Sequence, residues 1–305
     1  MDDRYTALGS NLKPNCLVIG ASGQLGSRVS DHFTELGWHV MNFARNSSTE
    51  SAKDFWARLD NIRSDFQIVV NAASPSHGFA VENPQVYLGW MNSHSKHLEA
   101  LSNRSSSSRL FSFSTTRVYG LNSQGVISEE SPTNPDSVYA EGHLSQETVL
   151  LESNWSILRL SNLFGRPGTH GRLSRTLLTN FVLAGFVAGE KTTLRGPSQT
   201  KKDFLPISAL LGVLESLAFS DMSVLLNVTS GQSRTLANWV NYLADAYENA
   251  TQFKPIFEFE SDFPTSPDVR LSNSRLKGLL PGWEPDFDNE VNSLLTYMRQ
   301  AHGST

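Results

Sequence analysis

The chain has 305 residues, of which 39% are hydrophobic and 18% are charged. That length allows one large domain or two modest ones, and this share of apolar side chains is enough to build a buried core. The 30 acidic and 25 basic residues give a net charge of −5. This balance excludes the broad positive field of a protein that holds nucleic acid or an anionic membrane surface.

The compartment follows from what the sequence lacks. A single cysteine, Cys16, excludes an internal disulfide and suits a reducing environment. The first fourteen residues are polar, without the apolar segment of a secretory signal. No stretch approaches the 18 uninterrupted apolar residues typical of a membrane-spanning helix. We therefore expect a cytoplasmic protein in which Cys16, within an apolar strand, is a buried small hydrophobe and not a nucleophile.

Short apolar runs alternate with helical patterns in the first half of the chain. The predicted strands are Cys16–Ile19, Trp38–Phe43, Ile68–Val70, Leu110–Phe113 and Trp155–Leu160. The predicted helices between them are Gln24–Leu36, Pro84–Leu101 and Val138–Leu151. Strands of this length separated by helices indicate βαβ units. The sequence therefore predicts an α/β fold, a doubly wound parallel sheet of the Rossmann type with helices on both faces.

The alternation loosens after Leu160, where we expect a smaller C-terminal α/β domain. We assign residues 14–165 to the sheet domain, with 203–231 returning to it, and residues 166–202 and 232–305 to the smaller domain. The elements predicted here are a strand at Leu225–Val228 and helices at Leu173–Phe186, Ser208–Ala218, Leu236–Tyr247 and Glu290–Arg299. The strongly apolar helix at 173–186 is too short to cross a bilayer, so we interpret it as a core helix.

A glycine-rich motif lies between the first predicted strand and the first predicted helix. Its residues are Gly20, Ala21, Ser22, Gly23, Gln24, Leu25 and Gly26. Glycines allow the backbone to approach a pyrophosphate, and the helix that follows offers free N–H groups and a partial positive charge. The motif follows a predicted strand and opens a predicted helix, as a dinucleotide-binding motif does. An ordinary glycine-rich turn need not lie between a strand and a helix, so this position predicts a dinucleotide-binding site.

The end of the second predicted strand indicates which dinucleotide is bound. A site that prefers NAD usually carries an acid there, about twenty residues after the glycines, to hold the ribose hydroxyls. Here the strand ends in Phe43-Ala44-Arg45-Asn46. Arg45 can neutralise a 2′-phosphate through its planar guanidinium. We therefore predict NADP(H) as the preferred cofactor, with NAD(H) as the alternative.

A third motif follows the Leu110–Phe113 strand and precedes a tyrosine. The segment Ser114–Gly120 lies where ligands bind in a parallel sheet, at the carboxyl end of a strand. Tyr139 and His143 are four residues apart on a predicted helix, so they share a face. Tyrosine is mostly protonated at neutral pH. To exchange a proton with a substrate it needs a nearby cation and a donor such as Thr115 that holds the substrate oxygen.

Together these motifs resemble those of the extended short-chain dehydrogenase/reductases, a family of nucleotide-sugar epimerases, dehydratases and reductases. The resemblance runs in order through almost the whole chain. It is carried by GASGQLG, Asn71–Ala73, Asn92, STTRVYG, Tyr139 with Glu147, RLSNLFG from Arg159, Lys202–Phe204 and the segment from Arg270 to Pro285. The GQLG and VVNAAS segments look most like those of NADP-dependent reductases of dTDP-linked 4-keto-6-deoxysugars.

The resemblance implies roles for individual residues. Thr115 matches the substrate-binding Ser/Thr, Tyr139 matches the catalytic acid/base, and Ala72 and Ala73 match residues that line the cofactor. Asn162 and Lys202 match residues that hold the diphosphate of the sugar nucleotide, with Arg270 as a weaker second contact. The family commonly has arginine at the position of Lys202, so here the contact would be a point charge.

Two positions depart from the family pattern. His143 stands where the family has a lysine that binds the nicotinamide ribose and lowers the pKa of the tyrosine. We expect His143 to serve the ribose and Tyr139 as a weaker, pH-sensitive cation. Dehydratases carry an Asp-Glu pair where this chain has Thr116 and Arg117. The acid and base needed to eliminate water are therefore missing, which argues against 4,6-dehydration.

The leading hypothesis is an NADPH-dependent reductase of a nucleotide-linked keto-sugar, in which Tyr139 donates the proton. Alternatives are a nucleotide-sugar epimerase and a non-catalytic NADP-binding protein, the latter because His143 replaces the lysine. The resemblance also implies a homodimer formed through the helices at 84–101 and 138–151. His94 and His97 lack a third ligand in a metal-binding spacing, so we expect no metal.

Overall fold

The computed structural model describes residues 13–47, 49–62, 65–105, 108–120, 125–220, 223–260 and 269–303. The polar N-terminal segment, where the sequence predicts no secretory signal, lies outside these residues except for its last two. Within the described residues, no helix is both long enough and apolar enough to cross a membrane.

A sheet of six parallel strands forms the centre of the described structure. From one edge to the other the strands are β10 (Leu225–Val228), β6 (Ser156–Leu160), β4 (Arg109–Thr115), β3 (Ile68–Asn71), β1 (Asn15–Ile19) and β2 (His39–Phe43). The chain runs from β1 outward to β2 and then returns to β3 on the other side of β1. This reversal opens a crevice at the carboxyl ends of β1 and β3, where open α/β sheets bind ligands.

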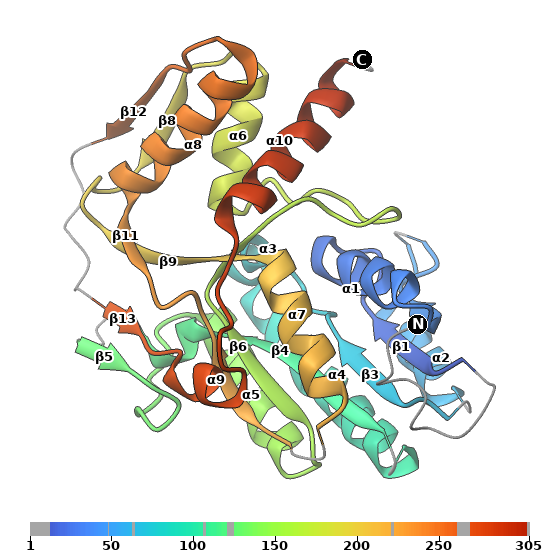
Figure 1. The fold of residues 1–305 in the computed structure, drawn as a ribbon. Coiled ribbons are helices and arrows are strands. Elements are labelled where there is room, and N and C mark those ends of the chain that lie inside the picture. Colours follow the sequence, from blue (N-terminus) through green and yellow to red (C-terminus); the bar gives the residue numbers. More distant parts are fainter. Residues whose placement is uncertain are drawn as a thin grey trace.

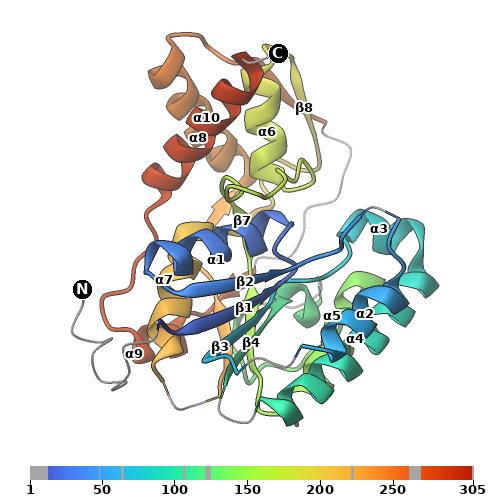
Figure 2. The ribbon, with the colours of Figure 1, turned by 90° about the vertical axis from the view of Figure 1, so that its right-hand side faces the viewer.

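Helices cover both faces of the sheet, which confirms the predicted α/β fold (Figures 1 and 2). One face carries α1 (Gln24–Glu35) and α7 (Ile207–Ala218), and the short α9 (Ser274–Leu279) lies beside β10. The other face carries α2 (Ala52–Asp60), α4 (Pro84–Arg104) and α5 (Val138–Leu151), with α3 (His77–Glu82) beside α4 and α5.

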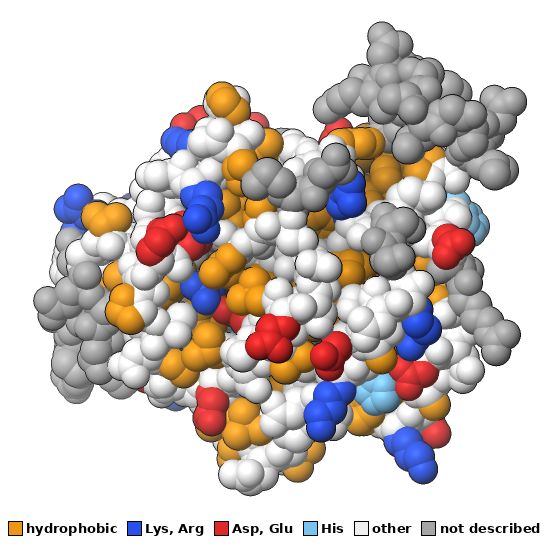
Figure 3. All heavy atoms as spheres, turned by 90° about the horizontal axis from the view of Figure 1, so that it is seen from below, with side chains coloured by type: hydrophobic (Ala, Val, Ile, Leu, Met, Phe, Trp, Pro, Cys, Tyr) orange, Lys and Arg blue, Asp and Glu red, His pale blue; other side chains and the backbone are white. Residues whose placement is uncertain are grey.

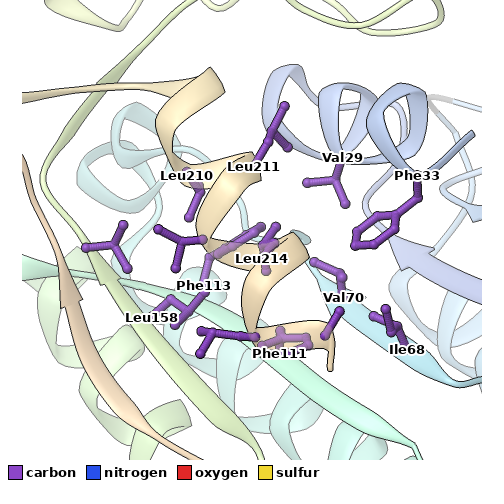
Figure 4. Close-up of a cluster of buried hydrophobic side chains, with 14 of the residues drawn as sticks. Val29, Phe33, Ile68, Val70, Phe111, Phe113, Leu158, Leu210, Leu211 and Leu214 are labelled. Carbon is purple, nitrogen blue, oxygen red and sulfur yellow. The ribbon is translucent and has the colours of Figure 1, made fainter. Parts of the chain in front are cut away.

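Side chains on the sheet alternate between the two cores. In β1, Cys16 and Val18 join the cluster under α1 and α7, while Leu17 and Ile19 join the cluster under α2, α4 and α5. All four are fully buried, as expected for a parallel sheet covered on both faces. Figure 4 shows leucines of α7 and apolar side chains of α1 packed on the α1/α7 face of the sheet. These two cores fix the strand ends on which the candidate site is built.

A smaller unit lies above the carboxyl ends of the strands (Figure 2). Its helices are α6 (Leu178–Val187), α8 (Leu236–Thr251) and α10 (Phe287–Gly303). Its strands are β7 (Asn162–Phe164) beside β9 (Lys201–Pro206), β9 beside β11 (Ser233–Thr235), and β8 (Thr192–Arg195) beside β12 (Phe257–Glu260). The buried Trp239 stacks on Phe204, with ring centroids 4.3 Å apart, at the centre of its core.

One helix boundary differs from the sequence prediction. The helix predicted from Leu173 begins at Leu178, after a turn at 175–176, and the N–H of Ser174 before it donates to Gln24 Oε1 of α1 over 2.7 Å. The division of the chain into two domains stays a prediction, and Leu276 of α9 packs in the core under α1 and α7. A last short pair, β5 (Gly125–Ile127) and β13 (Val269–Leu271), borders the candidate site.

The face seen from below in Figure 3 carries acidic and basic side chains interspersed with apolar ones. No large patch of one sign appears among the described residues on that face. The distribution agrees with the small net charge of the sequence.

Candidate active site

The glycine motif forms a close turn between β1 and α1. Gly20 has a φ of +87°, and its N–H donates to the carbonyl oxygen of Phe43 over 2.7 Å. A Cβ atom on Gly26 would lie 2.2 Å from the carbonyl oxygen of Gly20, so only glycine fits there. Gly23 caps α1 without any side-chain hydrogen bond to the first N–H groups. The residues therefore fit a dinucleotide, because the turn leaves backbone donors for a pyrophosphate at the start of the helix.

The other residues of this motif have different surroundings. Ser22 is exposed beside the turn, and Leu25 packs on the core under α7. The buried side chain of Gln24 accepts hydrogen bonds from the N–H of Ser174, at 2.7 Å, and from Asn180, at 3.0 Å. The side chain of Gln24 thus joins α1 to the smaller unit. Only the backbone of Gln24 would then be available to a cofactor.

The end of β2 carries Arg45 on an exposed loop. Sequence reasoning missed Glu50, which the loop brings back to this strand end. Arg58 donates to Glu50 Oε1 over 2.7 Å and to the carbonyl oxygen of Ala44, also over 2.7 Å. Hydrogen bonding from Arg58 lowers the pKa of Glu50. The carboxylate of Glu50 is therefore engaged, while Arg45 remains exposed at the end of β2.

The end of β3 lies directly beside the glycine turn. A Cβ atom on Gly20 would lie 2.7 Å from the backbone nitrogen of Ala73 and 2.8 Å from the carbonyl carbon of Ala72, so the two backbones touch. Asn71 Oδ1 accepts from the N–H of Ala73 at 3.2 Å and lies 3.1 Å from His94 Nε2. Burial lowers the pKa of His94 to about 3, so its imidazole is a neutral hydrogen-bond donor to Asn71. This brings Gly20, Ala72 and Ala73 together, as the sequence predicts.

Tyr139 is half-buried at the start of α5, among three other rings. Tyr87 stacks on it with centroids 6.0 Å apart, and the rings of His77 and His143 meet it edge-on at 5.4 Å and 4.7 Å. Burial raises the pKa of Tyr139, and the positive charge of Arg117 opposes that effect. The phenol is therefore protonated at neutral pH and able to act as a proton donor.

His143 shares a face of α5 with Tyr139, and the two rings meet edge-on at 4.7 Å. Its side chain is 4% exposed, and Nε2 lies 3.5 Å from the hydroxyl oxygen of Ser74. Nδ1 has no hydrogen-bond partner among the described residues. Burial lowers the pKa of His143 to about 4. The imidazole is therefore neutral near pH 7, because burial removes its water. A role of His143 toward the nicotinamide ribose and Tyr139 remains a prediction.

Thr115 ends β4 and is 9% exposed. Its Oγ1 accepts a hydrogen bond of 3.2 Å from the N–H of Arg117, in the 3₁₀ helix Thr116–Tyr119. The preceding Ser114 donates instead to the buried Glu147, which forms an ion pair of 2.6 Å with Arg159. This buried pair supports the end of β4 from below, while the Thr115 hydroxyl keeps its own hydrogen to donate to a ligand.

A pocket of about 250 Å³ opens between the strand ends and the smaller unit. It is lined by His77, Thr116, Arg117, Gly120, Asp136, Ser137, Asn162, Thr200, Lys201, Lys202, Asp203, Val269 and Leu271. Asn162 donates to the carbonyl oxygen of Asp203 over 2.8 Å, which orients its side chain beside Lys202. Burial, and secondly the charge of Arg117, lower the pKa of Lys202. The pocket thus brings the positive charges of Arg117 and Lys202 together, and an anionic ligand bound there would neutralise them.

Arg270 is not brought to this pocket. Its neighbours Val269 and Leu271 line the pocket, whereas Arg270 is exposed. Successive side chains of a strand point to opposite sides, so Arg270 of β13 faces away from the site.

Two further features lie apart from the chemistry. His97 is half-buried and pairs with Asp60 at 2.9 Å, whereas His94 is buried and its Nε2 lies 3.1 Å from Asn71 Oδ1. No group of three or more potential metal ligands occurs among the described residues. A larger hollow of about 460 Å³ between α8 and α10 contains none of the predicted site residues. We therefore place the candidate site at the carboxyl end of the central sheet.

Comparison with known proteins agrees with this geometry. UDP-glucuronic acid decarboxylase 1 of Xenopus tropicalis is 26% identical over 205 residues, which cover 63% of this chain and 47% of that protein. The chain thus spans about half the length of the curated relatives that it matches.

Solved structures share the fold at low sequence identity. UDP-glucose 4-epimerase of Thermotoga maritima, with UDP-glucose, has a TM-score of 0.78 and 20% identity, covering 94% of this chain and 99% of its own. The protein RMD of Pseudomonas aeruginosa, with NADPH, has a TM-score of 0.74 and 20% identity, covering 95% and 100%. The family described as NAD dependent epimerase/dehydratase matches residues 16–210, and the chain therefore belongs to that family.

Proposed function

We propose that the protein is an NADPH-dependent reductase of a nucleotide-linked keto-sugar of the 4-keto-6-deoxysugar class. The observation that carries this proposal is the arrangement around His77. Its ring contacts the protonated phenol of Tyr139, and it lines the same pocket as Arg117 and Lys202. The proton donor Tyr139 thus lies beside the pocket whose cationic side chains, Arg117 and Lys202, would bind a diphosphate.

In this proposal, each side chain has a defined task. Bound at the glycine turn, NADPH would supply a hydride to the carbonyl carbon of the sugar. Thr115 would donate a hydrogen bond to the carbonyl oxygen, and Tyr139 would transfer its proton to that oxygen as the hydride arrives. Asn162 and Lys202 would hold the diphosphate. His143, being neutral, would donate or accept a hydrogen bond at the nicotinamide ribose and carry no charge.

The choice of NADPH rests on the end of β2. Arg45 is exposed there, and the nearby carboxylate of Glu50 is occupied by Arg58. An acid that is already paired competes poorly for ribose hydroxyls, whereas a guanidinium pairs well with a phosphate. The NADPH bound to RMD gives a precedent for this cofactor on the same fold.

The choice of reduction rests on what the pocket lacks. Thr116 and Arg117 line the pocket where the dehydratases that the sequence resembles carry an acid and a base. Neither side chain can remove a proton from carbon as a carboxylate does. Elimination of water is therefore disfavoured, while hydride transfer with proton donation needs only Tyr139 and Thr115.

The test is consumption of NADPH with a panel of nucleotide keto-sugars, with Tyr139→Phe as the matched control. The proposal requires turnover by the wild type that the variant loses. Interconversion of UDP-glucose and UDP-galactose without net cofactor consumption would establish the epimerase alternative. Tight NADPH binding without any turnover would establish the non-catalytic alternative that the replacement of lysine by His143 suggests.

A homodimer through α4 and α5 remains a prediction. These helices expose the polar Asn92, Lys96, Glu141 and Thr148 and also the apolar Val86 and Leu151. Sedimentation at several concentrations would decide whether the protein associates.

A further inference from the structure

The rings around Tyr139 cannot supply the positive charge that a tyrosine acid needs. Burial lowers the pKa of His143 to about 4. Burial, and secondly the charge of Arg117, lower the pKa of His77. Tyr87 is also buried, and its pKa is raised. Near pH 7 all three are therefore neutral, although they contact Tyr139 from α3, α4 and α5.

Arg117 is the cation whose charge acts on Tyr139, and it lines the pocket that His77 also lines. It lies in the 3₁₀ helix that follows β4, and its N–H is bonded to Thr115 Oγ1. Its guanidinium is exposed at the pocket, where it lines the wall with His77 and Lys202. No hydrogen-bond or ion-pair partner of that guanidinium occurs among the described residues. Asp136 and Lys201 line the same pocket.

We infer that Arg117 is the positioning residue that provides Tyr139 with the positive charge which related enzymes obtain from lysine. The inference rests on the proposed function, because it assigns Arg117 a part in the same proton transfer. When the O–H bond of Tyr139 breaks, its proton passes to the oxygen of the reduced carbonyl and the electron pair remains on the phenolate. A guanidinium nearby stabilises that phenolate, so the phenol becomes a stronger acid.

The electrostatics of the site agree with this geometry. The positive charge of Arg117 acts on Tyr139, His77 and Lys202 alike. Arg117 and Lys202 line the same pocket wall, together with His77, whose ring contacts that of Tyr139. The competing role for Arg117 is a second diphosphate contact beside Lys202. That role would change substrate binding and leave the acidity of the phenol unaltered.

The experiment is a pH titration of tyrosinate absorbance in the cofactor-loaded protein. Subtracting the same titration of Tyr139→Phe isolates the signal of Tyr139. We expect Arg117→Gln to move that ionisation to higher pH and Arg117→Lys to restore it. Lys202→Gln, which removes a cation from the same pocket, should leave it in place. An unchanged ionisation in Arg117→Gln overturns the inference, as does a wild-type Tyr139 that stays protonated up to the pH of unfolding.

Kinetics provide the second readout. Arg117→Gln should lower kcat roughly tenfold or more while KM changes less than about threefold, because the acid is weakened and binding is kept. Lys202→Gln should mainly raise KM. A rise in KM alone in Arg117→Gln would assign Arg117 to the diphosphate and overturn the inference. If no keto-sugar is reduced by the wild type, the proposed function fails, while the titration still decides the role of Arg117.

Discussion

Burial of His143 predicts a loss of stability at mildly acidic pH. The side chain is 4% exposed, and burial lowers its pKa from 6.5 to about 4 in the folded protein. In the unfolded chain the imidazole is solvated and titrates near its reference pKa of about 6.5. Between these two values the unfolded chain binds a proton that the folded protein does not. The free energy of unfolding therefore falls as the pH drops below about 6.5 and levels off near pH 4.

The size of this effect follows from the two pKa values. At about 1.36 kcal/mol per pKa unit, the full difference is about 3 kcal/mol. Most of it is already lost at pH 5, where linkage gives about 2 kcal/mol relative to pH 7. That is a large fraction of the roughly 5–15 kcal/mol that stabilises most folded proteins.

The assay is urea unfolding of the wild type and of His143→Gln at pH 7 and pH 5. The wild type should lose about 2 kcal/mol more than the variant between these pH values, because glutamine does not titrate. His94 and the carboxylates contribute equally to both proteins, so the difference isolates one imidazole. His39→Gln, at an exposed position, is the control and should lose as much as the wild type. Equal losses for wild type and His143→Gln would refute the reasoning.

Four other changes test the site and its support. Glu147→Gln should lower the free energy of unfolding by about 3–5 kcal/mol, because it leaves Arg159 charged and 4% exposed without its partner; a loss below about 1 kcal/mol in urea unfolding contradicts this. Tyr139→Phe should reduce turnover by about two to four decades with little change in NADPH affinity; wild-type turnover would place the proton donor elsewhere. Arg45→Ala should weaken NADPH binding by roughly one to two decades and spare NADH, measured by fluorescence titration; equal effects on both cofactors argue against a 2′-phosphate contact. Gly26→Ala should abolish binding of either cofactor, since its Cβ would lie 2.2 Å from the oxygen of Gly20; retained affinity would show that the turn is not the cofactor site.

Much of the fold could be predicted because its information is local. Most of the parallel strands contain short apolar runs, and the helices between them have apolar side chains at helical spacing. The glycine turn could also be predicted, because the required close contact between Gly20 and Gly26 spans only six residues. The shorter strands could not. β9 pairs with β7, about forty residues earlier, and with β11, about thirty residues later, so its identity depends on distant partners.

The site divides in the same way. Sequence and resemblance predicted Tyr139 and Thr115 as site residues and placed them on a helix and at a strand end, where the structure has them. Only the tertiary structure decided that His143 is buried, which lowers its pKa, that Glu50 is paired with Arg58, and that Arg117 lines the pocket with His77 and Lys202. The reason is that hydrophobic periodicity depends on residues that are neighbours along the chain, whereas the protonation state of a side chain depends on its exposure to water. Whether a side chain keeps its water is set by residues that only folding brings against it.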